Sequence, residues 1–296
     1  MQMLVFGGSG RVGQVMCRAA RAAGWDVVAP AHAECDLLRP EAVSDFVLAH
    51  PHAHAVVNCA AVSGLEACLD DALSAHLINA VSPAQMALAC RHTGARFVHL
   101  STDYVLDGRR PGIKNETAPC KPVNTYGESK RESELQVMDA YAESLILRVS
   151  WVCGNAAKPS FVESSLARAL LGQPLAAVAD KYSLPTHVDD IARVVLALIP
   201  QVRLAGPLHL ASCGSPLSWR DCALVALACA AEQGALPSVP PVSPQKLAEA
   251  SFFRAPRPRH TAMDNAALLS HGVPMPTAEE TLRRATLGYL RSRGLI

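Results

Sequence analysis

The sequence predicts an α/β protein built on a doubly wound parallel sheet, with a second, smaller α/β domain. In the first half of the chain, short runs rich in β-branched residues alternate with longer segments rich in Ala and Leu, as in repeated strand–helix units. Glycines follow directly after the first of these runs. After Trp151 the rhythm changes, because prolines punctuate the chain and short strands separate the helical segments. This change indicates the second domain.

The expected elements alternate regularly along the chain. The strands expected in the first half are Met3–Phe6, Asp26–Ala29, Ala55–Cys59, Phe97–Ser101 and Leu145–Val149. Apolar residues recur at spacings of three and four in the segments between them, which predicts helices over Val12–Ala23, Glu41–Ala49, Leu73–His92 and Tyr126–Ala142. In the second half we expect helices over Ser160–Leu171, His187–Ile199 and Trp219–Glu232.

Composition argues against several classes of function. Lys and Arg number 27 against 26 Asp and Glu, so no overall field attracts nucleic acid or a membrane surface, and a small-molecule partner fits better. The longest apolar runs are about half the roughly 20 residues that span a bilayer. The 10 cysteines are scattered without a C-x-x-C pair, and the chain opens without a secretory signal. We therefore expect a cytoplasmic protein.

No metal site is expected. His50, His52 and His54 are two residues apart across a proline, a spacing that suits no closed tetrahedral site. His187, followed closely by Asp189, is interpreted as the start of a helix with an N-cap.

Gly7, Gly10 and Gly13 follow the first expected strand and open the first helix. Glycines at such a turn let the backbone approach a phosphate closely, and the helix N-terminus offers free N–H groups. This context predicts a dinucleotide-binding site. The second expected strand ends without a carboxylate that could hold a ribose 2′-hydroxyl, and His32 could lie beside a 2′-phosphate. The expected cofactor is therefore NADPH, with NADH as the alternative.

Tyr126 and Lys130 have the spacing Y-x-x-x-K, which sets both side chains on one face of a helix. A free phenol has a pKa of about 10, so it transfers its proton near neutrality only if a nearby cation stabilises the phenolate. Lys130 can supply that charge and also bind the nicotinamide ribose. Thr102 ends the fourth expected strand, at the edge where ligands bind in open α/β sheets, and its hydroxyl can bind a substrate carbonyl.

This ordered set resembles the extended short-chain dehydrogenase/reductase family, which has the Rossmann fold, and within it the branch of the dTDP-4-dehydrorhamnose reductases. The resemblance spans nearly the whole chain. It rests on residues 101–108 (STDYVLDG), 122–130 (PVNTYGESK), 147–151 (LRVSW), Pro185-Thr186 before Asp189-Asp190, and Arg257-Pro258. It implies an NAD(P)H-dependent oxidoreductase of dTDP-rhamnose biosynthesis that reduces a nucleotide-linked 4-ketosugar, with Tyr126 as the proton donor.

The resemblance also implies roles for single residues. Thr102, Tyr126 and Lys130 are catalytic, and Asp103 and Trp151 line the sugar site. Besides the glycines, Tyr126 and Lys130, the residues expected at the cofactor are Arg11, Val12, Asp36, Leu37, Ala60, Ala61 and Val62. We expect Arg257 to meet the substrate pyrophosphate, because the guanidinium fork suits phosphate oxygens.

Two departures from the family pattern leave the exact sugar nucleotide open. Residues 62–66 (VSGLE) replace the usual aromatic-Thr-Ala-Val-Asp pattern. Residues 257–261 (RPRHT) keep only part of Arg-Pro-x-x-Ser.

We expect a dinucleotide-binding domain over residues 1–153, with residues 185–202 packing back on it. Residues 154–184 and 203–296 then form the sugar-nucleotide domain. The sequence leaves the oligomeric state open, a homodimer included. It also leaves two alternatives for function: a non-catalytic NADP-binding regulatory subunit like that of methionine adenosyltransferase, and a sugar-nucleotide epimerase. The intact set of Thr102, Tyr126 and Lys130 argues against the first.

Overall fold

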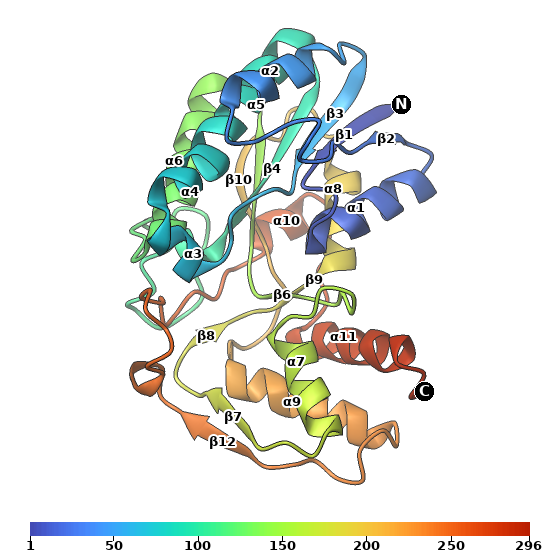
Figure 1. The fold of residues 1–296 in the computed structure, drawn as a ribbon, viewed down its shortest axis with the longest axis vertical. Coiled ribbons are helices and arrows are strands. Elements are labelled where there is room, and N and C mark those ends of the chain that lie inside the picture. Colours follow the sequence, from blue (N-terminus) through green and yellow to red (C-terminus); the bar gives the residue numbers. More distant parts are fainter.

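Six parallel strands form the central sheet of the protein (Figure 1). The computed structural model describes residues 1–296. In sheet order the strands are β10 (Gly206–Leu210), β5 (Leu145–Val149), β4 (Arg96–Thr102), β3 (Ala53–Asn58), β1 (Gln2–Phe6) and β2 (Asp26–Val28). All neighbouring strands in this sheet run parallel, so the predicted fold class is confirmed.

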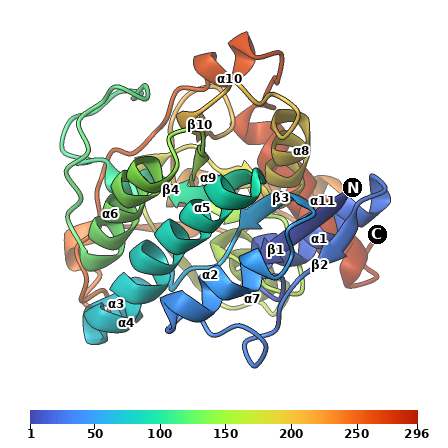
Figure 2. The same cartoon turned by 90° about the horizontal axis from the view of Figure 1, so that it is seen from above.

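Helices cover both faces of the sheet, as the view from above shows (Figure 2). Successive side chains of a strand point to opposite faces. In β1, Met3 and Val5 therefore belong to one core, while Leu4 and Phe6 belong to the other. The first core is closed by α1 (Arg11–Ala22), α8 (Val188–Leu198) and α10 (Ala266–Ser270). The second is closed by α2 (Pro40–Leu48), α5 (Ser82–Thr93) and α6 (Thr125–Ala140).

The long helix expected over Leu73–His92 is divided in the structure. It consists of α4 (Ala72–His76), a π-helical turn η1 (Leu77–Val81) and α5, and the short helix α3 (Leu65–Asp70) precedes it. A π-turn directs one side chain away from the regular helical positions, often at a functional site. Here that turn contains Asn79, which is buried.

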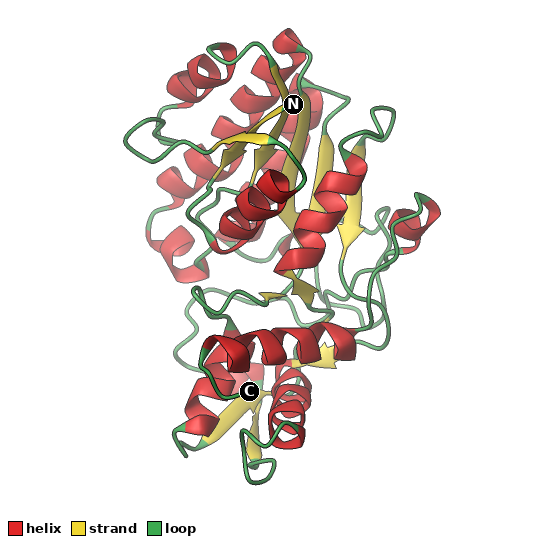
Figure 3. Cartoon of the chain, turned by 90° about the vertical axis from the view of Figure 1, so that its right-hand side faces the viewer, coloured by secondary structure: helices red, strands yellow, loops and turns green.

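The second domain lies below the sheet in Figure 3, and it has its own apolar core. Leu166, Leu227 and Leu282 pack together there from three helices. These helices are α7 (Phe161–Leu170), α9 (Trp219–Glu232) and α11 (Ala278–Ser292). The paired strands β7 (Leu175–Val178) and β12 (Val242–Gln245) complete this domain. The remaining elements are short: η2 (Asp103–Val105), β6 (Val152–Cys153), β8 (Tyr182–Ser183), β9 (Thr186–His187), β11 (Leu217–Ser218) and η3 (Leu247–Glu249).

The expected domain division needs one correction. Residues 203–296 were assigned to the second domain, but β10 pairs with β5 along its whole length and extends the central sheet. Leu268 of α10 also belongs to the core that lies against β1 and α1. Both segments therefore pack with the first domain, because their apolar side chains are buried against its sheet.

The cysteines are free thiols, and most are buried. Burial raises the pKa of Cys59 to about 12 and that of Cys68 to about 11. These thiols therefore stay protonated and pack as small apolar side chains. None of the helices has both the length and the apolar character needed to cross a membrane.

Candidate active site

The turn between β1 and α1 is shaped by glycines that no larger residue could replace. Gly7 has φ +76°, and a Cβ there would lie 2.7 Å from the backbone of Ala60. A Cβ on Gly13 would overlap the carbonyl oxygen of Gly7. Gly10 is the N-cap of α1 and provides no side-chain cap, so the first N–H groups of the helix face outward unpaired. This cradle fits a phosphate group.

A cavity of about 360 Å³ opens between this turn, the carboxyl ends of the central strands and the start of α6. Its lining contains predicted residues from every part of the expected site. They are Gly10, Arg11, Val12, Ala60, Ala61, Thr102, Asp103, Tyr126, Lys130 and Trp151. Residues separated by up to 141 positions therefore converge on one cavity.

Several predicted cofactor residues lie outside this lining. Gly7 and Gly13 shape the turn from behind. Asp36 accepts a hydrogen bond from the backbone N–H of Leu38 at 2.9 Å, and the Leu37 carbonyl accepts one from the Ser82 hydroxyl. Their contact with a cofactor stays a prediction.

Tyr126 comes close to Thr102 because the start of α6 is built for close approach. Asn124 caps the helix by accepting from the backbone N–H of Gly127 at 2.8 Å. A Cβ on Gly127 would overlap the carbonyl oxygen of Tyr104, so only glycine lets the first turn of α6 lie against η2. Tyr126 and Thr102 both line the cavity as a result, and hydrogen bonding with Thr102 is one of the influences on the pKa of Tyr126.

Burial raises the pKa of Tyr126 above the ordinary phenol value, although the hydrogen bond with Thr102 opposes the shift. The phenol is therefore protonated at neutral pH. A protonated hydroxyl at the mouth of a cavity can give its proton to an oxygen bound beside it.

Lys130 is almost fully buried one helical turn after Tyr126. Its Nζ donates to the Leu100 carbonyl at 2.7 Å and lies 2.9 Å from Nε2 of His99. Burial lowers the pKa of Lys130 to about 7, against the opposing charge of Glu134. The side chain can therefore hold or release a proton near neutrality.

A buried ion pair lies behind this lysine. Arg148 of β5 makes two hydrogen bonds of 2.8 Å to Glu134 of α6, and both side chains are at most 2% exposed. Ser101 also donates to Glu134, at 2.7 Å. Burial tends to raise the pKa of Glu134, but hydrogen bonds from Arg148, Ser101 and Arg131 outweigh it and lower that pKa. The pair fixes α6 against the ends of β4 and β5.

Asp103 is buried at the far side of the cavity. It accepts hydrogen bonds from Ser150 at 3.0 Å, from Ser183 at 3.3 Å and from Thr261. Burial raises the pKa of Asp103, against the charge of Lys181. The carboxyl is therefore held by the second domain as well as by the first.

Trp151 has φ +41°, and it is the only residue other than glycine with a positive φ. Its indole N–H is buried without a partner. A strained backbone and an unpaired donor at one position are typical of a ligand site. Trp151 also lines a second cavity, of about 410 Å³, which shares Arg11 and Val152 with the first.

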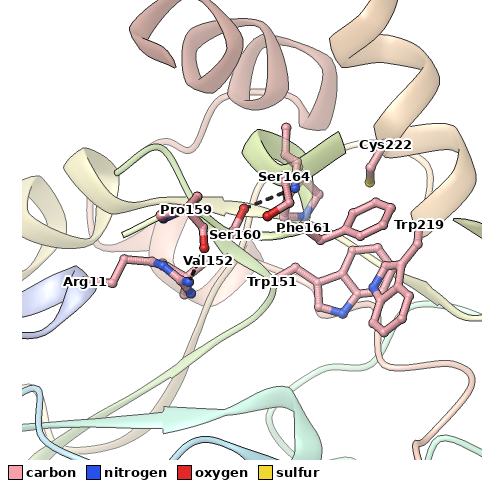
Figure 4. Close-up of a pocket in the computed structure, with 11 residues that line it drawn as sticks. Arg11, Trp151, Val152, Pro159, Ser160, Phe161, Ser164, Trp219 and Cys222 are labelled. Carbon is pink, nitrogen blue, oxygen red and sulfur yellow. Dashed lines mark hydrogen bonds between the residues drawn. The ribbon is translucent and has the colours of Figure 1, made fainter. Parts of the chain in front are cut away.

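Three aromatic side chains lie together in the lining of the second cavity (Figure 4). The rings of Phe161 and Trp219 stack at 5.6 Å, and Trp151 lies 5.8 Å from Trp219. At the opposite end Arg11 donates to the carbonyl of Pro159 at 2.9 Å, which joins α1 to the second domain. The two cavities thus form adjoining parts of the space between the domains.

Arg257 does not line either cavity. It forms an ion pair with Glu66 at 2.9 Å and stacks on the ring of Phe253 at 3.6 Å. Its side chain is 7% exposed. Contact between Arg257 and a substrate pyrophosphate therefore stays a prediction.

Sequence reasoning missed several residues that build the site. Asn58 and His99 lie behind Lys130, and Asn79 joins the loop after β3 to α6 through hydrogen bonds with Val62 and Ser129. These residues lie on expected strands and helices. The one sequence signal for them is that some are near the ends of strands, where ligands bind in such sheets. Lys181 gave no signal, because a single lysine in a loop is normally exposed.

Comparison with known proteins identifies related chains over the full length. Residues 1–289 match the family model of the RmlD substrate-binding domain. The spore coat polysaccharide biosynthesis protein SpsK of Bacillus subtilis is 30% identical over 99% of this chain and 98% of that protein. The dTDP-4-dehydrorhamnose reductase of Burkholderia thailandensis is 33% identical over 93% of this chain and 95% of that protein.

A solved structure shares the fold. The dTDP-4-dehydrorhamnose reductase of Bacillus anthracis, solved in complex with NADP, superimposes with a TM-score of 0.87. It is 26% identical, and the match covers 97% of this chain and 98% of that one.

Proposed function

The chain belongs to the RmlD substrate-binding domain family, and on this premise we propose that it is an NADPH-dependent reductase of a nucleotide-linked 4-ketosugar, similar to dTDP-4-dehydrorhamnose reductase. The observation that carries the proposal is the convergence of Thr102, Tyr126 and Lys130 on one cavity beside the glycine turn. A proton donor, a group that orients a carbonyl and a nearby cation are what carbonyl reduction requires of a protein.

The nicotinamide cofactor supplies the hydride when it is bound. Tyr126 gives its phenol proton to the carbonyl oxygen of the substrate, and Thr102 orients that oxygen by a hydrogen bond. The ammonium form of Lys130 stabilises the phenolate that remains. Lys130 is also the residue proposed to hold the nicotinamide ribose, and the turn at Gly10 to hold the pyrophosphate.

Two features support NADPH over NADH. The stretch from Ala29 to His32 after β2 contains no carboxylate of its own, and the nearby Glu34 carboxylate is held by the backbone N–H of Ala31 at 2.7 Å. His32 is 81% exposed in the same loop, where its present partner is Asp36 at 3.6 Å, and it is proposed to turn from that partner toward an anion. The related reductase of Bacillus anthracis was solved with NADP, which agrees with this preference.

The sugar and its nucleotide are proposed to lie on the side of the second domain. Asp103 and Trp151 line the cavity and are the residues proposed to contact the sugar. The unpaired indole N–H of Trp151 could donate to a sugar hydroxyl or a phosphate oxygen. Arg257 is proposed to meet the pyrophosphate after its present partner, Glu66, is displaced.

The experiment that tests this function is incubation of the purified protein with dTDP-, UDP- and GDP-linked 4-ketosugars, with NADPH absorbance as the measure. Turnover of one of these, with the 4-hydroxyl sugar identified as the product, supports the reductase. NADPH binding without turnover of any ketosugar would instead support the non-catalytic dinucleotide-binding subunit. Interconversion of sugar epimers without net oxidation of NADPH would support the epimerase.

A further inference from the structure

Asn58 and His99 lie side by side behind Lys130. The register of β3 and β4 pairs the two residues directly, and both side chains are buried. Nδ2 of Asn58 lies 3.1 Å from Nδ1 of His99. Nε2, on the opposite edge of the same ring, lies 2.9 Å from Nζ of Lys130. The imidazole therefore connects the sheet to the lysine of the site.

The protonation of the ring follows from the partners of Asn58. Its Oδ1 accepts a hydrogen bond from the backbone N–H of Ala60 at 2.9 Å. The NH2 group must then face His99 and donate to Nδ1, so Nδ1 carries no hydrogen. Burial, with the charge of Lys130, holds the pKa of His99 well below its ordinary value, so the ring is neutral. Its single hydrogen is on Nε2.

This hydrogen faces two groups, Nζ of Lys130 and the hydroxyl of Ser133, each 2.9 Å from Nε2. The Ser133 oxygen can accept the hydrogen bond. An ammonium group cannot, because it has three donors and no lone pair, whereas a neutral amine can accept. The contact with His99 is therefore compatible with the amine form of Lys130 and unfavourable for the ammonium form.

We propose that Asn58 and His99 are positioning residues for the reaction: Asn58 fixes the His99 tautomer with hydrogen on Nε2, and that N–H favours the release of a proton by Lys130. This inference rests on the proposed function. It assigns a task to two buried polar residues that line neither cavity. Both act on Lys130 through the His99 ring.

The remaining groups around Lys130 are consistent with this effect. On α6, Glu134 favours the ammonium form, but its own charge is shared with Arg148 and Arg131. Tyr126, also on α6, is neutral because burial raises its pKa. On β4, His99 is the titratable neighbour. The pKa of about 7 at Lys130 agrees with an environment that favours the amine.

The consequence is a proton supply within one turnover. When Tyr126 protonates the substrate oxygen, its O–H bond breaks and the O–H bond of the product alcohol forms. The ammonium of Lys130 then gives one N–H proton to the phenolate, which restores the phenol, and the amine left behind takes up one proton from solvent, so each turnover consumes one solvent proton. A lysine that releases its proton readily shortens the life of the phenolate.

The test measures the tautomer and the titration on the isolated protein. In ¹⁵N-labelled protein, long-range ¹H–¹⁵N NMR reports which nitrogen of His99 carries hydrogen, with His99→Gln providing the assignment. The Lys130 titration is followed by ¹³Cε resonances of labelled lysine, with Lys130→Met providing the assignment. Neither measurement needs a substrate, so failure here is distinct from failure of the proposed function.

Two variants should reverse the effect. In Asn58→Asp the carboxylate accepts from Nδ1–H, so Nε2 becomes an acceptor for the ammonium group. In His99→Gln the amide oxygen can accept from the same group without adding a charge. We expect the titration midpoint of Lys130 to rise by about one to two pH units in both variants. This shift corresponds to the free energy of one hydrogen bond to a charged group.

Ser133→Ala is the matched control. It removes the other partner of Nε2 but leaves the tautomer fixed by Asn58, so the midpoint should not rise. The proposal is overturned if the native protein carries hydrogen on Nδ1 of His99. It is equally overturned if neither Asn58→Asp nor His99→Gln raises the Lys130 midpoint. Should a variant fail to fold, the tautomer of the native protein still decides.

Discussion

Nη2 of Arg257 lies 2.9 Å from Oε1 of Glu66, so the arginine expected at the substrate phosphates already binds a carboxylate. Glu66 is in the first turn of α3 of the first domain, and Arg257 lies in the loop of the second domain that packs against it. The pKa of Glu66 is lowered by the hydrogen bond from Arg257, although partial burial opposes the shift. An ion pair thus joins the two domains next to the proposed substrate cleft.

The first prediction concerns this pair. If Arg257 binds the pyrophosphate, Arg257→Ala should raise the substrate KM by about 10- to 100-fold, the loss of a charge-assisted hydrogen bond, with little change in the Kd of NADPH. Glu66→Gln should lower the substrate KM, because the competing carboxylate is gone. Steady-state kinetics and NADPH titration measure both effects.

The control for this prediction is Arg254→Ala. Arg254 pairs with Asp70 of the same helix, but both side chains are 56% exposed, so its loss should leave the substrate KM nearly unchanged. The role of Arg257 in substrate binding is rejected if both variants change the substrate KM equally, or if Arg257→Ala leaves that KM unchanged. The ion pairs would then serve only the packing of the domains.

The second prediction concerns the choice of cofactor. NADPH should bind more tightly than NADH, and His32→Ala should reduce the preference by about two- to fivefold, because an exposed charge contact contributes only ~0.5–1 kcal/mol. His32 is 81% exposed and lies 3.6 Å from Asp36, so it can exchange that partner for a phosphate. Fluorescence titration with both cofactors at fixed ionic strength gives the ratio. A native preference for NADH would reject the assignment.

The parts of this fold that depend on local sequence could be predicted. Strands such as β1 and the spacing between Tyr126 and Lys130 are patterns within a few residues, and the structure has both as expected. α11 was missed although its N-cap Thr277 forms a capping box with Glu280, because its buried stripe is made partly of alanines and threonines, which give a weak apolar signal. The signal was present in the sequence.

The rest depends on pairings between distant residues. β10 is five residues long and contains a proline, and it becomes a strand because β5 accepts it at the sheet edge. The partner of Arg257 is 191 residues away in sequence. Nothing in residues 257–261 indicates that partner. The ion pair between Arg257 and Glu66 could therefore be found only in the folded protein.

The third prediction concerns stability. Glu134→Leu should destabilise the protein by about 3–5 kcal/mol, because it leaves Arg148 buried without its partner. Arg148→Met should have a similar cost. The double variant Glu134→Leu with Arg148→Met should be close to the native protein, since no unpaired charge remains. Urea unfolding of the four proteins measures the coupling, and additive effects of the single changes would contradict it.

The same pair predicts a dependence of stability on pH. The pKa of Glu134 is lower in the folded protein than in the unfolded chain. Its contribution is therefore fully present above the unfolded pKa and is lost as the pH falls through the folded value. Acid unfolding of Glu134→Gln should depend less steeply on pH than that of the native protein. An identical dependence in both would assign acid unfolding to other groups.

The fourth prediction concerns the pH dependence of activity. The pKa of Lys130 is lowered to about 7, so the ammonium fraction falls as the pH rises through that value. If the ammonium stabilises the phenolate of Tyr126, kcat/KM should decline above about pH 7. The profile should be recorded with NADPH absorbance at constant ionic strength. A rate that stays level well above pH 8 would remove the ammonium from the mechanism.

The last prediction tests the catalytic pair directly. Tyr126→Phe removes only the transferable proton and its hydrogen bond with Thr102, so the fold and the Kd of NADPH should remain nearly native. The rate of reduction should fall by about 10²- to 10⁴-fold, the usual contribution of a positioned general acid. Lys130→Met should be at least as damaging to the rate and should also weaken NADPH binding, because Lys130 is proposed to contact the ribose.

Tyr182→Phe serves as the control for the loss of a phenol. Tyr182 lies outside the cavity and stacks on His260 at 5.5 Å, so its hydroxyl should not matter for the rate. The contrast between the two phenylalanine variants separates proton transfer from general packing. Near-native turnover by Tyr126→Phe would show that another group protonates the substrate, and the cavity would then retain only its proposed role in dinucleotide binding.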